Sequence, residues 1–456
     1  MSKIEDVART IEDAINDNLL KPGERLSSVR TAADQYHVSK NTIVEAYSRL
    51  SARQLIIAKH GSGFFVADRS GLDQDKEEAV VEAYDRMSLL RAQLTQQFSI
   101  RPGDGRPPPS WMNSALPKRI NADSLFDKES DQGGYGNPLG HGQLREMIAR
   151  RFATQGAPVS PNQIVTTFGA NHALDLIIRR FLTQGQTVLV DDPGYYPLIA
   201  KLKLAKIKVI GVPRIHNGPD LGKLRQLSEE HRPAFYFTQS TAHNPTGTCY
   251  DLQTAHNALK IAAQYNFRIV DDDPFVDLIG NATSGSRLWE LDGFQSVIFV
   301  GSYSKILSAS FRSGYIISSQ EIIEALTDLK IVTTVNSSRM SEMLIASMMR
   351  SGRFDQHLKK LSQLLDGART ECVRMISDLE IKPYCPEPHG YYTLLEFPKS
   401  VTLEKMQKVA RRLSVFTAPG NYFYVSKENS LSMSMRVNFS RSANKRFETF
   451  LNELCN

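Results

Sequence analysis

Lys305 is the residue of this chain whose neighbours best suit a covalent reaction with a carbonyl group. The segment Ser302–Tyr303–Ser304–Lys305 follows the apolar run 296–300 and sets the lysine between hydroxyl groups, with Arg312 a short distance further on. A lysine amine can form an imine, and hydroxyls together with a guanidinium can bind a dianionic phosphate. Taken alone, such a short motif would favour an ordinary lysine in a surface loop.

Four further segments bring chemically useful groups beside predicted strands and turns. Each alone also fits an ordinary loop, turn or surface residue, so the prediction rests on all of them together. They are the acidic strand end Asp271–Asp272–Asp273–Pro274, the amide-bearing turn His243–Asn244–Pro245–Thr246–Gly247, the helix start Gly169–Ala170–Asn171 and the rigid turn Asp192–Pro193–Gly194–Tyr195. In order, they offer a carboxylate, a side-chain amide on a turn, backbone amides for phosphate and a ring for stacking. Pyridoxal 5′-phosphate (PLP) requires such parts, and the sequence predicts a site for it.

The elements that would position these groups alternate from about residue 99 onward. Strand-like apolar runs at 164–168, 187–190, 207–212, 234–238, 268–271, 296–300 and 314–317 are separated by helical patterns. This alternation is typical of an α/β domain with a largely parallel sheet. After about residue 331, a long helical stretch and strand-like runs at 391–397 and 434–440 predict a smaller terminal subdomain.

Residues 1–68 follow another pattern, in which three helices precede two short strands. Apolar residues at 4, 7, 8, 11, 14 and 15 have helical spacing, Ser28 and Ser39 stand where helix N-caps belong, and strand-like runs at 55–58 and 63–66 flank a turn. This order predicts a winged helix-turn-helix, although one polar helix alone would fit a solvated surface. The candidate DNA contacts are Arg30, Ser39, Lys40, Asn41 and Thr42, with Lys59 and His60 on the wing.

Residues 20–66 resemble the winged-helix domain of GntR-type bacterial transcription regulators. The resemblance rests on the patterns Leu-x-Ser-x-Arg, Ala-Tyr-x-x-Leu and Gly-Ser-Gly-x-x-Val, while Ser27 and Ile43 depart from the usual proline and valine. It implies binding to a double-stranded DNA operator. We expect residues 69–98 to be a linker, of which 79–94 has a helical pattern.

Residues 99–456 resemble fold-type I PLP enzymes of the class I aminotransferase group. The resemblance implies that Lys305 forms the internal aldimine with PLP, that Asp272 pairs with the pyridine nitrogen and that Tyr195 stacks on the ring. It further implies that Asn244 binds the ring oxygen, and that phosphate is held by Ala170, Asn171, Ser302, Ser304 and Arg312. Tyr135 matches a tyrosine that reaches the neighbouring subunit's cofactor, and Arg436 matches an arginine that binds a substrate α-carboxylate.

One departure from this group concerns catalysis. Its members usually carry Asp-x-x-Tyr, in which the phenol donates to the ring oxygen, whereas here Phe275 follows Asp272. We expect the missing phenol to weaken turnover without preventing cofactor binding. The register within Asp271–Asp273 is open by one residue.

Composition sets outer limits on these predictions. The chain has 456 residues, a length that favours two or more domains. Of these residues 41% are hydrophobic and 23% are charged, and the net charge is +6. The hydrophobic content excludes wholesale disorder. Its cysteines lie far apart without nearby histidines, so we expect neither a disulfide framework nor a metal site. With no apolar run long enough for a bilayer and no signal-peptide pattern, we expect a cytoplasmic protein.

A winged helix linked to an aminotransferase-like domain resembles MocR/GabR-type regulators of the GntR family. The resemblance implies a homodimeric, PLP-dependent transcription regulator that senses PLP or an amino compound. The alternative is a catalytically competent aminotransferase with an attached DNA-binding module. A third possibility is a dimerisation scaffold that has lost the cofactor.

Overall fold

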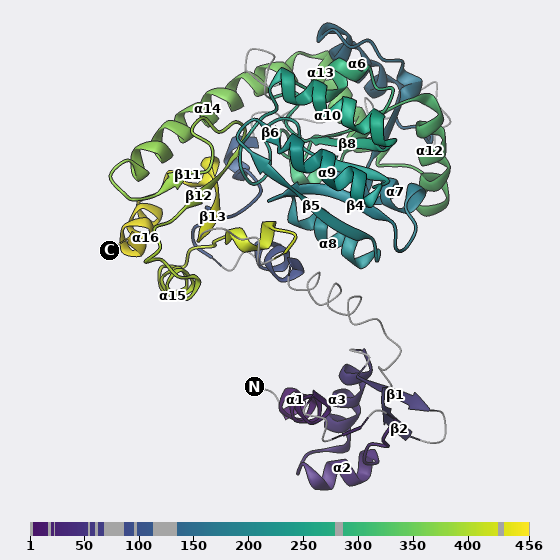
Figure 1. The fold of residues 1–456 in the computed structure, drawn as a ribbon, viewed down its shortest axis with the longest axis vertical. Helices are drawn as coiled ribbons and strands as arrows, with labels where there is room; N and C mark the ends of the chain where they lie inside the picture. The colour runs from purple at the N-terminus through teal and green to yellow at the C-terminus, as the bar shows by residue number, and fades with distance from the viewer. Residues whose placement is uncertain are drawn as a thin grey trace. The chain divides into compact units, whose positions relative to one another are not determined.

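The computed structural model describes residues 3–16, 20–21, 23–52, 55–59, 63–67, 86–94, 98–112, 135–278, 286–426 and 433–455. The chain divides into two compact units, Met1–Glu78 and Ala79–Asn456 (Figure 1). The border predicted near residue 68 and most of the predicted linker lie outside the described residues. Within the described ranges, no helix is long and apolar enough to cross a membrane.

The N-terminal unit confirms the predicted order of three helices and a hairpin. Its elements are α1 (Lys3–Asn16), α2 (Val29–Gln35), α3 (Lys40–Ala52), β1 (Ile56–Lys59) and β2 (Gly63–Val66). The two strands pair antiparallel, with Ile56 opposite Val66. Their connection, which includes the predicted DNA contact His60, lies outside the described residues.

Local sequence explains these helices. The Ser28 hydroxyl caps α2 by accepting from the Thr31 amide at 3.2 Å, and the Ser39 hydroxyl accepts from the Thr42 amide at 3.2 Å at the start of α3. The apolar stripes of the helices then meet in one small core, which buries Ile11, Ile43 and Leu50 among others.

The second unit is built on an eight-stranded sheet with the order β3-β10-β9-β8-β7-β4-β5-β6. Strands β5, β4, β7, β8 and β9 run parallel, whereas β10 is antiparallel to both of its neighbours. The strands are β3 (Ile164–Thr167), β4 (Thr187–Asp192), β5 (Lys208–Ile215), β6 (Gly218–Pro219), β7 (Phe235–Thr238), β8 (Arg268–Asp273), β9 (Val297–Ser302) and β10 (Gly314–Ile317). The predicted α/β class is confirmed.

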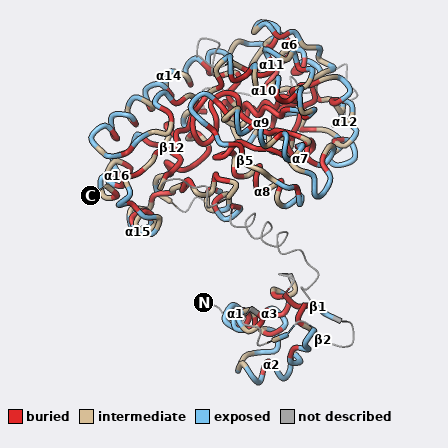
Figure 2. The backbone as a smooth tube through the Cα atoms, in the orientation of Figure 1, coloured by how far each residue is buried: buried red, intermediate tan, exposed pale blue. Residues whose placement is uncertain are grey.

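Helices cover both faces of this sheet, as the continuous apolar runs of the strands require. One face packs on α6 (Gly142–Thr154), α9 (Leu221–His231), α10 (Leu252–Tyr265) and α11 (Leu288–Asp292). The other face packs on α7 (Ala170–Phe181), α8 (Tyr196–Leu204) and α12 (Gln320–Thr334). Figure 2 shows the resulting buried centre, with exposed residues on the outer helices.

A smaller subdomain surrounds a three-stranded antiparallel sheet of β11 (Lys382–Pro383), β12 (Tyr392–Glu396) and β13 (Ser434–Asn438). Its helices include α14 (Arg353–Ile376), α15 (Leu403–Leu413) and α16 (Lys445–Cys455), while α5 (Pro109–Met112) and α13 (Arg339–Arg350) complete the unit. Residues 86–94, inside the predicted linker, are helical as expected. They pack within the second unit, where Leu89 joins a cluster with Tyr196 and Phe423.

Candidate cofactor site and DNA-binding face

The predicted cofactor residues gather where the parallel strands end. Strands β4, β7, β8 and β9 run in one direction, so their carboxyl ends meet at the same edge of the sheet. Ligand groups in open α/β folds lie at this edge. It presents Lys305 directly after β9, Asp272 on β8 and Tyr195 after β4.

The Lys305 amine is partly buried and lies near both arginine and aspartate side chains. Its Nζ atom donates to the Gly105 carbonyl oxygen. Burial and the neighbouring Arg436 guanidinium lower the pKa of Lys305 to about 8. An amine with this pKa is partly neutral near physiological pH, which is the form that can attack a carbonyl carbon.

Of the three carboxylates on β8, Asp272 alone keeps an oxygen without a hydrogen-bond partner. Asp271 accepts from the Ser240 amide at 2.9 Å and its hydroxyl at 2.7 Å, while Asp273 accepts from the Thr241 hydroxyl at 2.5 Å and the Phe275 amide at 2.8 Å. Asp272 accepts only from Gln239 Nε2 at 3.0 Å, and its other oxygen is buried and unpaired. The geometry therefore favours Asp272 in the register that the sequence left open.

Burial sets the protonation of Asp272. Desolvation raises its pKa to about 7, the Asp273 charge acts in the same direction, and Gln239 and Lys305 oppose them. A cationic partner on the unpaired oxygen would restore the ionised form.

A cradle for an anion lies at the N-terminus of α7. Gly169 has a φ of +84°, and a Cβ atom at this position would lie 3.5 Å from Ser304 Oγ and 3.7 Å from the terminal nitrogens of Arg312. Ser304 Oγ is buried and has no hydrogen-bond partner. Ala170 and Asn171 form the first turn of α7, and Ser302 Oγ accepts from the Ser304 amide at 3.3 Å. These residues fit a phosphate group, because backbone amides, hydroxyls and a guanidinium converge on one space.

Asn244 and Arg436 meet at the other side of Lys305. Arg436 on β13 is 1% exposed, donates to Asn244 Oδ1 at 3.0 Å and to the Gly103 carbonyl at 2.7 Å, and forms no ion pair within the described residues. Its guanidinium lies 5.0 Å from the centroids of both the Tyr392 and Phe423 rings. A buried guanidinium without a counter-ion is a favourable partner for a carboxylate.

Gln239 is a site residue that the sequence analysis missed. Besides donating to Asp272, its Oε1 accepts from the Asn244 amide at 2.8 Å, so it fixes the two residues relative to each other. It directly follows β7, and the strand-end argument that found Asp272 could have found it as well. Tyr392, Phe423 and Gln93 were also missed, because they come from β12, a short turn and the predicted linker.

A buried polar network supports the turn that carries Asn244. Arg214 pairs with Asp191 at 3.1 Å, and His243 lies 3.4 Å from the same carboxylate while its Nδ1 contacts the Thr246 hydroxyl at 2.8 Å. Burial lowers the pKa of His243 to about 4, so its ring is neutral near pH 7. Arg214 consequently carries the positive charge that balances Asp191.

Tyr135 lies apart from this cluster within the chain. Its side chain is 76% exposed. The following residue, Gly136, lies against Asn336, whose Nδ2 would be 3.3 Å from a Cβ atom at position 136. Tyr135 thus belongs to a surface beside the loop between α12 and α13.

The predicted DNA contacts lie on exposed parts of the N-terminal unit. Arg30 is exposed on α2, Ser39 precedes α3, and Lys40 and Asn41 are exposed in its first turn, with Thr42 half-buried. Val44, 51% exposed one turn after Asn41, extends this face and was not predicted. The side chain of Lys59 lies outside the described residues, as does His60.

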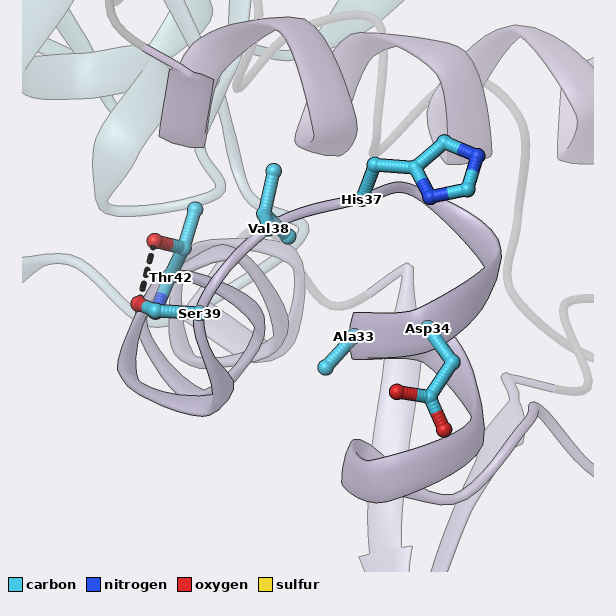
Figure 3. Close-up of a pocket in the computed structure, with 6 residues that line it drawn as sticks. All are labelled: Ala33, Asp34, His37, Val38, Ser39 and Thr42. Carbon is cyan, nitrogen blue, oxygen red and sulfur yellow. Dashed lines mark hydrogen bonds between the residues drawn. The ribbon is translucent and has the colours of Figure 1, made fainter.

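A hollow of about 610 Å³ opens beside the turn between α2 and α3. Figure 3 shows its lining residues: Ala33, Asp34, His37, Val38, Ser39 and Thr42. The hydroxyl groups of Ser39 and Thr42 lie 2.8 Å apart at its edge. The start of α3 is therefore accessible within this unit, as a helix that reads a groove must be.

Comparison with protein families gives one match for each of the two units. The family model of class I and II aminotransferases matches residues 101–454, which is most of the chain. The chain belongs to the class I and II aminotransferase family. Members of this family are PLP-dependent. The model of GntR-family bacterial regulatory proteins matches residues 3–66 of this aminotransferase-family chain, so its N-terminal unit is a GntR helix-turn-helix domain.

Relatives share both parts in the same order. The chain is 25% identical over 441 residues to the HTH-type transcriptional regulator YdcR of Escherichia coli (strain K12), covering 93% of this chain and 92% of that protein. It is 24% identical over 426 residues to the HTH-type transcriptional regulator NorG of Staphylococcus aureus (strain USA300), covering 90% and 95%. The chain is therefore a GntR-type regulator with an aminotransferase-like domain, consistent with the MocR/GabR type.

Solved structures confirm the fold of the larger unit. The multiple substrate aminotransferase of Thermococcus profundus matches with a TM-score of 0.71 at 24% identity, covering 81% of this chain and 93% of that one. The α-aminoadipate aminotransferase LysN of Thermus thermophilus matches with a TM-score of 0.71 at 23% identity, covering 84% and 99%.

Proposed function

We propose that this regulator binds PLP through Lys305 and changes its affinity for DNA when PLP or an amino compound occupies the site. The observation that carries the proposal is the convergence of the Lys305 amine, the unpaired oxygen of Asp272 and the cradle formed by Gly169, Ser304 and Arg312. These groups share a chain with a GntR-type helix-turn-helix.

The assigned roles follow from the chemistry of each group. Lys305 would supply the amine, and the Asp272 carboxylate would accept a hydrogen bond from the protonated pyridine nitrogen. Tyr195 would offer its ring face, and Asn244 would offer its amide to the ring oxygen. Ala170, Asn171, Ser302, Ser304 and Arg312 surround the phosphate. PLP, when bound, supplies an aldehyde for an amine and a ring that absorbs visible light.

Arg436 is the candidate group for an effector carboxylate. Its guanidinium is held in place by Asn244 and by the Tyr392 and Phe423 rings, so it is oriented before an anion arrives. The aromatic rings also exclude water, which strengthens the interaction with a carboxylate. An amino acid that carries one free carboxylate fits these groups.

Phe275 favours sensing over sustained transamination. Its ring is buried, carries no hydroxyl of its own and lies 5.5 Å and 5.8 Å from the Tyr391 and Tyr392 rings. No phenol is therefore offered from position 275 to hold a proton beside Lys305. The alternative function is a working aminotransferase with a DNA-binding module, and the test described below distinguishes the two.

An exposed apolar surface supports a homodimer. Val332 is 84% exposed, and Ile331, Val335 and Met340 are exposed beside it at the junction of α12 and α13. The surface also contains Tyr135, which in a dimer would face the partner subunit. Large apolar side chains grouped on a surface are typical of protein interfaces. Two winged helices in such a dimer would read paired half-sites.

The test measures DNA binding together with turnover. PLP-loaded full-length protein is titrated onto the upstream region of its own gene, with and without each standard amino acid, and the same mixtures are assayed for repeated cycling with a keto acid. We expect at least one amino acid, or PLP itself, to change DNA affinity about 5-fold or more, without multiple turnovers. Sustained cycling without any change in DNA affinity would contradict the proposal and favour the enzyme.

A further inference from the structure

Residues 101–106, called the strap below, cross the site and contact both of its cationic groups. The Gly103 carbonyl accepts from Arg436 at 2.7 Å, and the Gly105 carbonyl accepts from Lys305 Nζ and, at 2.7 Å, from the Tyr392 hydroxyl. A Cβ atom at Gly105 would lie 3.3 Å from Arg436. Backbone carbonyls of the strap thus bind Arg436, the proposed partner of a carboxylate, and Lys305, the proposed partner of an aldehyde.

The strap is fixed to the smaller subdomain. The Asn438 amide donates to the Pro102 carbonyl at 2.7 Å, and its side chain donates to the Asp104 and Arg106 carbonyls at 2.8 and 3.2 Å. Since Asn438 lies on β13 two residues after Arg436, the strap and Arg436 belong to one rigid group. The bond from Lys305 connects this group to the edge of the large sheet.

Two arginines connect the strap to the helix formed by residues 86–94. Arg101 and Arg106 both donate to the backbone carbonyl of Gln93 on that helix. The same arginines pair with the fully buried Asp104, at 2.9 Å and 3.0 Å. Asp104 therefore holds both guanidinium groups in the orientation that reaches Gln93.

Arg86, the first described residue of this helix, is anchored beside the ring that covers Arg436. Arg86 donates to the carbonyls of Tyr422, Tyr424 and Val425, on either side of Phe423. Leu89 packs in the same cluster as Phe423 and Tyr196. The Tyr196 hydroxyl in turn donates to Gln93 Oε1 at 3.4 Å. Leu89 and Gln93 of this helix thus contact residues beside Arg436, and Arg86 holds the segment that carries Phe423.

We propose that the strap and helix 86–94 form a relay that converts occupation of the site into movement of the chain leading to the winged helix. Engaging the Lys305 amine, or placing a carboxylate on Arg436, removes a hydrogen bond that holds the strap. The Arg101–Asp104–Arg106 group passes this change to Gln93, and helix 86–94 loosens. This relay rests on the proposed function, because it presumes that Lys305 is the attachment point of PLP.

The relay is tested by hydrogen exchange in the full-length protein. PLP is added to PLP-free protein, its visible absorption band is recorded, and backbone exchange is measured for peptides that cover residues 86–94. We expect exchange in these peptides to become about 5-fold faster or more, the lower end of typical allosteric coupling. Exchange in β8 and β9 should change less, because these strands lie in the centre of the sheet.

Two variants and a control make the result specific. Arg106→Met leaves Asp104 paired with Arg101 but removes one donor to Gln93, and Arg86→Ala removes the contacts to the carbonyls of Tyr422, Tyr424 and Val425. Each variant should abolish most of the exchange response. Arg91→Ala, on the exposed side of the same helix, should keep it. Unchanged exchange in wild-type protein whose visible band has formed would overturn the relay, whereas absence of the band would contradict the proposed function instead.

Discussion

The two units of this protein both offer groups for anions, but they do so in opposite surroundings. The predicted DNA face of the winged helix presents Arg30, Lys40 and Asn41 to solvent, whereas the candidate cofactor site buries Arg436 and Asp272 and half-buries Lys305. An exposed cation is solvated before and after binding, so each one contributes little to the free energy of binding. Salt also screens its attraction to phosphate. A buried charged group that loses its partner has a high free energy, so each partner in a buried pair contributes strongly to binding.

This difference predicts unequal sensitivity to substitution. The DNA face should lose affinity gradually as single residues are removed. The cofactor site should lose function abruptly, because removal of one buried partner leaves another unpaired. Four substitutions or titrations test this comparison.

The largest effect is expected for Asp272→Asn. An amide carries no negative charge to balance a protonated pyridine nitrogen, and loss of one partner of a buried charged pair costs about 3 kcal/mol, or about 100-fold in the dissociation constant of PLP. Equilibrium dialysis with absorbance detection measures this constant. Asp271→Asn is the matched control, and a larger loss there than at position 272 would show that the register is wrong.

Arg436→Lys comes next. An ammonium cannot form the bidentate contact of a guanidinium, so the concentration of amino acid that half-converts the visible spectrum should rise about 10- to 30-fold. Arg411→Lys on the exposed side of α15 serves as the control. If the two variants respond alike, Arg436 does not bind the effector carboxylate.

The rate of PLP attachment should change about tenfold per pH unit at pH values below the pKa of Lys305. Because the pKa of Lys305 is lowered to about 8, its ammonium predominates below pH 8 and cannot attack an aldehyde. The rate should therefore rise about tenfold between pH 6 and pH 7 and level off above about pH 8. Stopped-flow absorbance measures it, and a plateau reached only above pH 10 would contradict the lowered pKa.

The smallest effect is expected for Arg30→Ala on DNA binding. Loss of one exposed phosphate contact should weaken binding about 5-fold at low salt and reduce the slope of log affinity against log salt by about 1. Arg49→Ala, near the end of α3 and paired with Glu45 at 3.3 Å, is the control. Equal losses in both variants would count against the placement of the DNA contacts.

Sequence patterns predicted the winged helix, the strands of the large sheet and the groups at its edge, because each depends on local spacing. Helix 86–94 shows where such reasoning ends. Its helical pattern was read correctly, but its attachment to Tyr422, Tyr424 and Val425 joins positions far apart in the chain and leaves no periodic signal. Likewise, the distinction between Asp271, Asp272 and Asp273 needed their hydrogen-bond partners, since all three are buried on one strand.

The visible absorption spectrum of the purified full-length protein, recorded before and after addition of PLP and compared with that of Lys305→Ala, tests the central claim most directly. The wild-type protein should develop a visible band that survives dialysis, and the variant should lose the colour on dialysis. A colourless wild-type protein, or a variant that retains the band, would contradict the assignment of Lys305.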